Sequence, residues 1–361
     1  MYSHYTNMKH ICLLSCIILY LVSCSHEDQD NGPASPPAPT RGELAVPPGF
    51  PQPYIPVFNP QTVEGIQLGH MLYYDSILST NGLRCASCHI SSASFSSPVF
   101  FPLAGGQISV PPHVNLAWNP DYNWEGSASM LDHVALGDFE PEFFNTNMAL
   151  LVQKLKQHPE YPELFYKAFG IIDVSKLSYD DLKLKISYAL TQYLRTMVSA
   201  NSRFDKFVNH QINLTNEEFD GFLTYSTERG DCFHCHGTIL LTNNTYHNNG
   251  LDTLFTGFNR GRYLVTGDLH DMGKFSAPTL RNVELTAPYM HDGRFSTLEE
   301  VVEFYNSGVH LNSPNIDPIM TKPAKLTGLN LTEQQKTNLV LFLKALTDTT
   351  FINNPSFLDP F

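Results

Sequence analysis

Basic residues are scarce in this chain of 361 residues, because 22 Lys and Arg stand against 35 Asp and Glu, which gives a formal charge of −13. A surface of that sign argues against nucleic acid and against an anionic membrane face as partners, since phosphates need basic residues. It permits a basic protein partner. Long alternation of apolar and polar residues is also lacking, which argues against an extended sheet. The 42% of hydrophobic residues exclude a disordered chain, and at about 100–200 residues per domain the length predicts two domains.

The N-terminal apolar segment is too short to cross a bilayer, which needs about 20 residues. Ile11–Val22 fits the core of a signal peptide instead. Leu21-Val22-Ser23-Cys24 resembles a bacterial lipobox, so residues 1–24 are predicted to be a lipoprotein signal peptide, with an ordinary secretory signal as the alternative. Both predict export to the periplasm or cell envelope, and a lipid on Cys24 would anchor the protein to a membrane, on its periplasmic or surface face. Residues 25–56 are rich in proline and predict an extended linker that holds the folded part away from the membrane.

The rest of the chain carries helical signals, so we predict an all-α fold with long loops. Weaker helix patterns cover Asn145–Leu155 and Pro162–Phe169. Residues 91–128 and 237–290 are rich in Ser, Gly, Asn and Pro, and loops of this length need something to organise them. Apolar residues at helical spacing follow four N-terminal capping sequences, which are Ser178 with Asp181, Thr215 with Glu218, Ser296 with Glu299 and Thr332 with Gln335.

Two C-x-x-C-H motifs stand in the chain, CASCH at Cys85–His89 and CFHCH at Cys232–His236. This spacing is that of c-type haem attachment, because two thiols reach one edge of the porphyrin and the following His reaches the iron. Zinc is one alternative, but it usually takes its ligands from closely spaced pairs, and these pairs lie far apart. A redox dithiol is the other, but it needs no following His. Two covalently bound haems c are therefore predicted in two domains, residues 57–212 with Cys85, Cys88 and His89, and residues 213–361 with Cys232, Cys235 and His236.

Three further stretches resemble the bacterial di-haem cytochrome c peroxidase and MauG family. Residues 68–79 (LGHMLYYDSILS) are similar to the family's L-G-x-x-L-F-x-D-x-x-L-S. Residues 115–126 (NLAWNPDYNWEG) parallel its N-V-A-x-N-P…W-D-G. Residues 274–293 (KFSAPTLRNVELTAPYMHDG) nearly repeat its F-K-x-P-T-L-R-N-V-x-L-T-A-P-Y-x-H-D-G. The resemblance covers nearly all of residues 57–348 and implies two cytochrome-c-like haem domains.

The resemblance implies an oxidoreductase of the cytochrome-c peroxidase type. Hydrogen peroxide would be reduced to water at the haem of His89. Electrons would come from a small cytochrome c or another extracytoplasmic carrier, through the haem of His236. A MauG-like oxidase of a protein or small molecule is the first alternative, and a plain di-haem electron carrier is the second.

The resemblance also assigns the remaining iron ligands. The sixth ligand of the C-terminal haem falls on Tyr305, where ordinary members carry Met, and Met290 and Met320 are the alternatives. A phenolate is a harder donor than a thioether and lowers the haem potential. At the N-terminal haem the family's distal His falls on Gly105, which predicts an open iron position, with His113 as the alternative ligand.

Two residues are implied in catalysis. Trp124 matches the family's Trp between the two haems and would relay electrons, whereas Trp118 would be a packing residue. Cleavage of the O–O bond needs an acid–base group, and the family's Glu is best matched by Glu142. Glu140 and His133 are the alternatives.

The family also implies a calcium ion, bound partly through the backbone carbonyls of Thr286 and Pro288. Its side-chain ligand, an Asn, falls on Ser109, so the chain lacks an amide oxygen that calcium would use. A second departure is Ser127, where the family usually has Arg.

Overall fold

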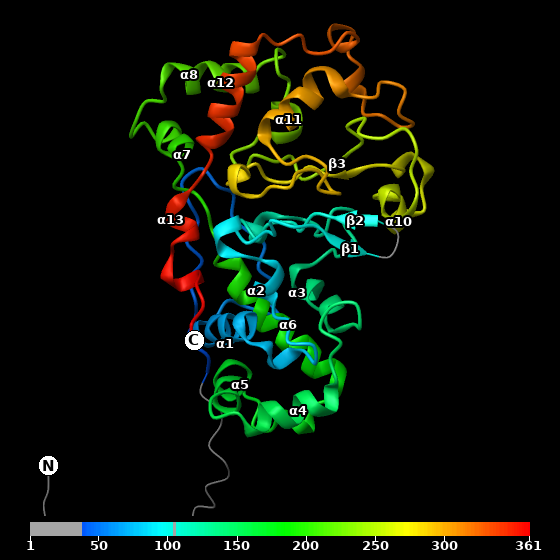
Figure 1. Ribbon diagram of the computed structural model, residues 1–361. Helices are drawn as coiled ribbons and strands as arrows, with labels where there is room; N and C mark the ends of the chain where they lie inside the picture. The colour runs from blue at the N-terminus through cyan, green and yellow to red at the C-terminus, as the bar shows by residue number, and fades with distance from the viewer. Residues whose placement is uncertain (1–37, 104–105) are drawn as a thin grey trace, which may run out of the picture. The chain divides into compact units, whose positions relative to one another are not determined.

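The computed structural model describes residues 38–103 and 106–361, so the predicted signal peptide, Cys24 and Gly105 lie outside the described residues (Figure 1). Residues 36–361 form one compact unit. Most of its regular structure is helical, and the strands in the described part are short, which confirms the prediction of a mainly helical fold.

The α-helices are joined by loops that contain many short 3₁₀ turns. They are α1 (Val63–Tyr74), α2 (Cys85–Cys88), α3 (Leu131–Val134), α4 (Met148–Gln157), α5 (Tyr161–Phe169), α6 (Tyr179–Arg195), α7 (Arg203–Val208), α8 (Asn216–Tyr225), α9 (Phe233–His236), α10 (Tyr263–Thr266), α11 (Leu298–Glu303), α12 (Glu333–Lys344) and α13 (Thr349–Ile352). The strands form two antiparallel pairs, β1 (Phe101–Leu103) with β2 (Gly106–Ile108) and β3 (Tyr246–His247) with β4 (Phe275–Ser276).

Local capping explains where several helices begin. The side chain of Ser178 accepts from the backbone N–H of Asp181 at the start of α6. Reciprocal capping boxes form at Thr215 before α8 and at Thr332 before α12, as predicted. The box predicted at Ser296 is wrong by one residue, because Thr297 caps α11 together with Glu300. Two neighbouring hydroxyls are each able to cap, and the sequence alone does not rank them.

Each half of the chain buries an apolar cluster around a pair of contacting helices, α1 with α6 and α8 with α12. A glycine lets each pair approach closely. A Cβ on Gly69 of α1 would collide with the carbonyl of Ala189 in α6, and a Cβ on Gly221 of α8 would collide with the carbonyl of Asn338 in α12. The helix that precedes each C-x-x-C-H motif is therefore held against a later helix of the same half, which fixes where the motif enters the core.

The end of the chain packs against the first of these clusters. Phe351 of α13 and Phe357 belong to it, and the Phe351 ring meets the ring of Phe95 edge-on at 5.4 Å. The predicted division at residues 212 and 213 stays a prediction.

Part of the predicted linker lies against the folded unit. The backbone N–H of Thr40 donates to the Glu64 carboxylate at 2.8 Å, and the indole of Trp118 donates to the Pro51 carbonyl at 2.7 Å. Phe50 meets the Trp118 ring edge-on at 5.2 Å. The segment 40–51 therefore does not act as a free tether, in contrast to the interpretation of residues 25–56, and Trp118 is a packing residue. Among the helices described, none is long and apolar enough to cross a membrane.

Candidate functional site

The first C-x-x-C-H motif occupies helix α2 and the residue after it. Its thiols, Cys85 and Cys88, are free, and burial raises the pKa of both, that of Cys88 to about 11. The Nδ1–H of His89 donates to the Phe95 carbonyl at 2.9 Å, which leaves Nε2 available to a metal. Burial lowers the pKa of His89 to about 4, so the imidazole is neutral at pH 7, the form that binds iron.

The second motif repeats this arrangement at helix α9. Cys232 and Cys235 are free thiols, and burial raises their pKa to about 12 and about 11. The Nδ1–H of His236 donates to the Leu241 carbonyl at 3.2 Å, and burial lowers the pKa of His236 to about 4.

The carbonyls that orient the two histidines come from residues in the same unusual backbone conformation. Phe95 has a φ of 58° and Leu241 a φ of 55°, which is the left-handed region that bulky residues rarely enter. Such conformations persist only where the surroundings enforce them. Each site thus combines two free thiols with a neutral imidazole whose Nε2 is unused, and this donor set fits a haem.

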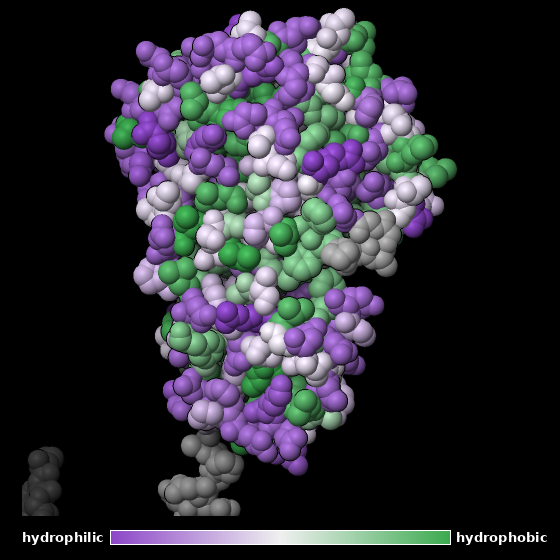
Figure 2. All heavy atoms as spheres, viewed as in Figure 1, coloured by the Kyte–Doolittle hydropathy of each residue, from purple (hydrophilic) through white to green (hydrophobic). Residues whose placement is uncertain are grey.

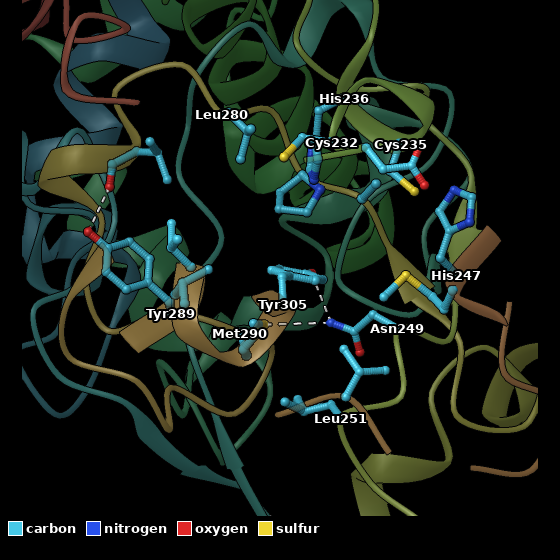
Figure 3. A pocket seen from close by; sticks show the side chains of 18 of the residues that line it. Cys232, Cys235, His236, His247, Asn249, Leu251, Leu280, Tyr289, Met290 and Tyr305 are labelled. Carbon is cyan, nitrogen blue, oxygen red and sulfur yellow. Dashed lines mark hydrogen bonds between the residues drawn. The ribbon is translucent and has the colours of Figure 1, made fainter. Parts of the chain in front are cut away.

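A cavity of about 400 Å³ lies beside the second motif and is lined by Cys232, Cys235, His236 and Tyr305 (Figure 3). In Figure 3 the imidazole of His236 points toward Tyr305. Tyr305 stands in a π-helical turn, Phe304–Gly308, which directly follows α11. Such turns interrupt α-helices and frequently lie at functional sites. The structure therefore brings together the two residues predicted to ligate the C-terminal haem.

The phenol of Tyr305 is held by a residue that the sequence did not single out. The side-chain amide of Asn249 donates to Tyr305 Oη at 3.0 Å, and the same nitrogen lies 3.8 Å from the sulfur of Met290. Burial raises the pKa of Tyr305 to about 12. Met320 also lines the cavity, so both predicted rivals of Tyr305 are present there. No sequence motif marks Asn249, because its partner is distant in the chain.

His113 does not fit the role of a sixth ligand opposite His89. The two imidazoles stack face to face, with ring centres 3.5 Å apart and planes 16° from parallel. Ligands on opposite faces of a haem instead direct ring nitrogens at one iron from two sides. His113 Nδ1 pairs with the hydroxyl of the buried Tyr73 at 3.2 Å, so the His113 ring contacts both His89 and Tyr73.

The predicted acid–base residues lie at the surface. Glu142, Glu140 and His133 are exposed, and Glu140 approaches only Lys183, at 3.9 Å. The neighbouring Asp138 differs, because burial raises its pKa to about 7. After burial, its charge is the next largest cause of the raised pKa at both thiols of the first motif, so it lies in their electrostatic neighbourhood.

Trp124 lines the same cavity as His236, and its indole N–H donates to the Ser109 carbonyl at 2.7 Å. All polar groups of Ser109 are engaged, since its N–H donates to the His291 carbonyl at 2.8 Å and its hydroxyl donates to the Pro288 carbonyl at 3.0 Å. Ser109 therefore connects Trp124 by hydrogen bonds to the segment that carries the H-D-G sequence.

The segment that begins at Ser109 also contacts the loop after the first motif. The hydroxyl of Ser96 donates to the Val110 carbonyl at 2.6 Å. Residues 109 and 110 therefore link the surroundings of the first motif to Trp124.

Two groups of the segment predicted to bind calcium have hydrogen-bond partners in this structure. The Pro288 carbonyl accepts the Ser109 hydroxyl, and the Thr286 hydroxyl donates to the Val283 carbonyl at 3.2 Å. The calcium site stays a prediction.

Comparison with known proteins identifies the family of the chain. The family model for di-haem cytochrome c peroxidase matches residues 63–213. The chain is 30% identical to the methylamine utilization protein MauG of Methylorubrum extorquens, over 81% of this chain and 80% of that protein. It is 31% identical to cytochrome c551 peroxidase of Nitrosomonas europaea, over 69% and 75% of the two chains.

A solved structure shares the fold. A MauG-like protein associated with microbial copper homeostasis superposes with a TM-score of 0.78 at 31% identity, over 88% of this chain and 99% of that one. The chain therefore belongs to the di-haem cytochrome c peroxidase and MauG family, whose members are oxidoreductases with two haem groups.

Proposed function

We propose that this protein reduces hydrogen peroxide to water with electrons from a small cytochrome c or a similar extracytoplasmic donor. The observation that carries the proposal is the twice-repeated set of two free thiols and a neutral imidazole tied through Nδ1 to a backbone carbonyl. The relatives named cytochrome c peroxidase support the same activity. The chain's excess of acidic residues suits a basic donor.

We assign one covalently bound haem to Cys85, Cys88 and His89 and another to Cys232, Cys235 and His236, in two cytochrome-c-like domains. When bound, the haems supply iron that exchanges electrons and cleaves the O–O bond. The backbone carbonyls of Phe95 and Leu241 hold the Nδ1–H of His89 and His236, so that Nε2 of each imidazole would be free to ligate the iron. Tyr305, across the second cavity, is the proposed sixth ligand there.

We assign the proton transfer at the first site to Asp138, because its charge acts on both thiols of the motif and its pKa is raised close to neutral, where acid–base catalysis is most effective. Glu142, the residue predicted from the sequence, is the alternative. Trp124 is the proposed electron relay, and its contact with Ser109 keeps the indole in place. Calcium has no part in the proposed reaction.

A second candidate function is MauG-like oxidation of a protein or small molecule. The position of Tyr305 across from His236 favours it, since an anionic oxygen ligand lowers the potential of a haem. The relative named MauG supports this alternative.

Stopped-flow absorbance of the purified, fully ferric protein mixed with hydrogen peroxide tests the proposal. A rapid spectral change without prior reduction means that the His89 site is open and favours the MauG-like mechanism. A change only after one electron has been added supports a peroxidase that requires reductive activation. If neither state reacts, the protein is an electron carrier and the proposal is wrong.

We propose in addition that the protein is exported and lipid-anchored through Cys24. The lipobox-like sequence before Cys24 supports this placement. Mass spectrometry of the mature N-terminus checks it, because a diacylated Cys24 is expected in the native protein and an unlipidated, released form in Cys24→Ser.

The surface presents both hydrophilic and apolar side chains to a protein donor. Figure 2 shows one face of mixed character, with hydrophilic residues predominating around α4 and α5. Several large apolar side chains are exposed in one segment, among them Leu254 at 81% and Leu269 at 67%. Titration with basic and acidic small cytochromes c at low and high salt is expected to show a preference for the basic one that salt weakens.

A further inference from the structure

One side-chain amide faces two different iron-binding donors in the second cavity. Asn249 donates to Tyr305 Oη at 3.0 Å, and its nitrogen lies 3.8 Å from Met290 Sδ. Figure 3 shows these three side chains together on the side of the cavity toward which His236 points. A phenol oxygen and a thioether sulfur are therefore both close to the place where a sixth ligand of the His236 iron belongs.

The chain around Asn249 holds this amide in place. The neighbouring Asn248 is 2% exposed and donates to the Ser313 hydroxyl and to the Pro314 carbonyl, at 3.1 and 2.7 Å. The N–H of Gly250 donates back to Asn248 Oδ1 at 2.9 Å. Residues 248–250 are thus anchored on both sides of Asn249, so its side chain is oriented before any ligand binds.

Met290 is also held in an unusual conformation. Its φ is 69°, which a residue with a long side chain rarely adopts, and the Ala287–Met290 segment leads directly into the buried His291. The local chain therefore directs a thioether into the cavity, at a position where packing alone would be served by an ordinary conformation.

The two donors respond differently to an amide N–H. A phenol or phenolate oxygen is a strong hydrogen-bond acceptor, whereas a thioether sulfur is a weak one. Hydrogen bonds to ligands tune a metal site from outside its coordination sphere. The amide therefore favours a state in which Tyr305 oxygen lies at the iron and Met290 sulfur stands aside.

We propose that Asn249 is a positioning residue that selects Tyr305 oxygen over Met290 sulfur as the sixth ligand of the His236 haem. This inference rests on the proposed assignment of His236 and Tyr305 as ligands. Without the amide, sulfur competes for the iron, and the potential of this haem rises because a thioether favours the reduced state.

The test compares the ferric and ferrous spectra and the reduction potentials of haem-loaded variants. In Asn249→Leu we expect the ratio of oxygen to sulfur ligation to fall by about 10–100-fold, the range expected for a hydrogen bond to a charged group. A sulfur-to-iron charge-transfer band should appear and the potential should shift positive. Asn249→Asp keeps the shape of the side chain but replaces the donor by an acceptor. It should shift the ligation ratio and the reduction potential in the same direction as Asn249→Leu. An unchanged spectrum, or a changed potential without sulfur ligation, overturns the proposal.

Three further variants separate the possible failures. Asn249→Leu combined with Met290→Leu should lack the sulfur band, which identifies Met290 as its source. Asn353→Ala, at an exposed site directly after α13, is the matched control and should leave the spectrum as in the native protein. Tyr305→Phe must change the ferric spectrum if Tyr305 is a ligand. If it does not, the proposed ligand set fails. If it does while Asn249→Leu has no effect, only the role of Asn249 fails.

Discussion

Replacing Asp138 by Asn changes both stability and catalysis in a way that can be worked out from burial. Burial raises the pKa of Asp138 from its ordinary value of 3.8 to about 7. One pKa unit corresponds to about 1.36 kcal/mol, so keeping this carboxylate ionised in the folded state costs up to about 4 kcal/mol. The pKa of Asp138 is higher in the folded than in the unfolded state, so the free energy of unfolding falls as the pH rises. This loss of stability is absent below about pH 4, grows up to about pH 7 and stays constant above that.

Asn is neutral at every pH and does not carry this cost. We therefore expect the free energy of unfolding of Asp138→Asn, measured by urea titration, to exceed that of the native protein by up to about 4 kcal/mol at pH 8. At pH 4 the two free energies should be similar. Glu142→Gln is the matched control. It makes the same carboxylate-to-amide change at an exposed site and should shift stability by less than about 0.5 kcal/mol at either pH. Equal pH dependence in native protein and Asp138→Asn would refute the reasoning.

The same two variants separate the two proposed proton donors. If Asp138 moves the proton, Asp138→Asn should slow the reaction of the protein with hydrogen peroxide by about 10²–10⁴-fold, while Glu142→Gln reacts at the native rate. The reverse pattern would assign the step to Glu142, as the sequence predicted.

Three other changes have defined outcomes. Ser109→Ala leaves the half-buried Pro288 carbonyl without its donor and should cost about 1 kcal/mol in urea unfolding, whereas Ser129→Ala at an exposed site should cost nothing measurable. Asp205→Ala leaves Arg281, which is 1% exposed, without its carboxylate partner and should cost about 3–5 kcal/mol by the same assay. Replacing both thiols of the first C-x-x-C-H motif by Ala should halve the haem that stays on the chain in a denaturing gel, and full retention would contradict covalent attachment there.

Features that depend on a few neighbouring residues could be read from the sequence. The capping boxes at Thr215 and Thr332 form as predicted, because a hydroxyl and a carboxylate or amide three residues apart satisfy each other's backbone groups locally. The two C-x-x-C-H motifs are equally local, since their spacing alone places two thiols and an imidazole on one side of the chain. Where two adjacent residues have the same capping ability, as at Ser296 and Thr297, the sequence left the boundary open by one residue.

Tertiary structure alone decided which groups face these motifs. His113 stacks on His89, Asn249 reaches Tyr305, and Ser109 joins Trp124 to Pro288 across long separations in the chain. The sequence shows which carboxylates are present but not their environment, so it pointed to Glu142, which is exposed, and did not single out Asp138, whose pKa is raised by burial. Local spacing determines the chemistry that a segment can carry. Desolvation and long-range hydrogen bonds, which arise only when distant segments pack together, determine which of those groups act at the site.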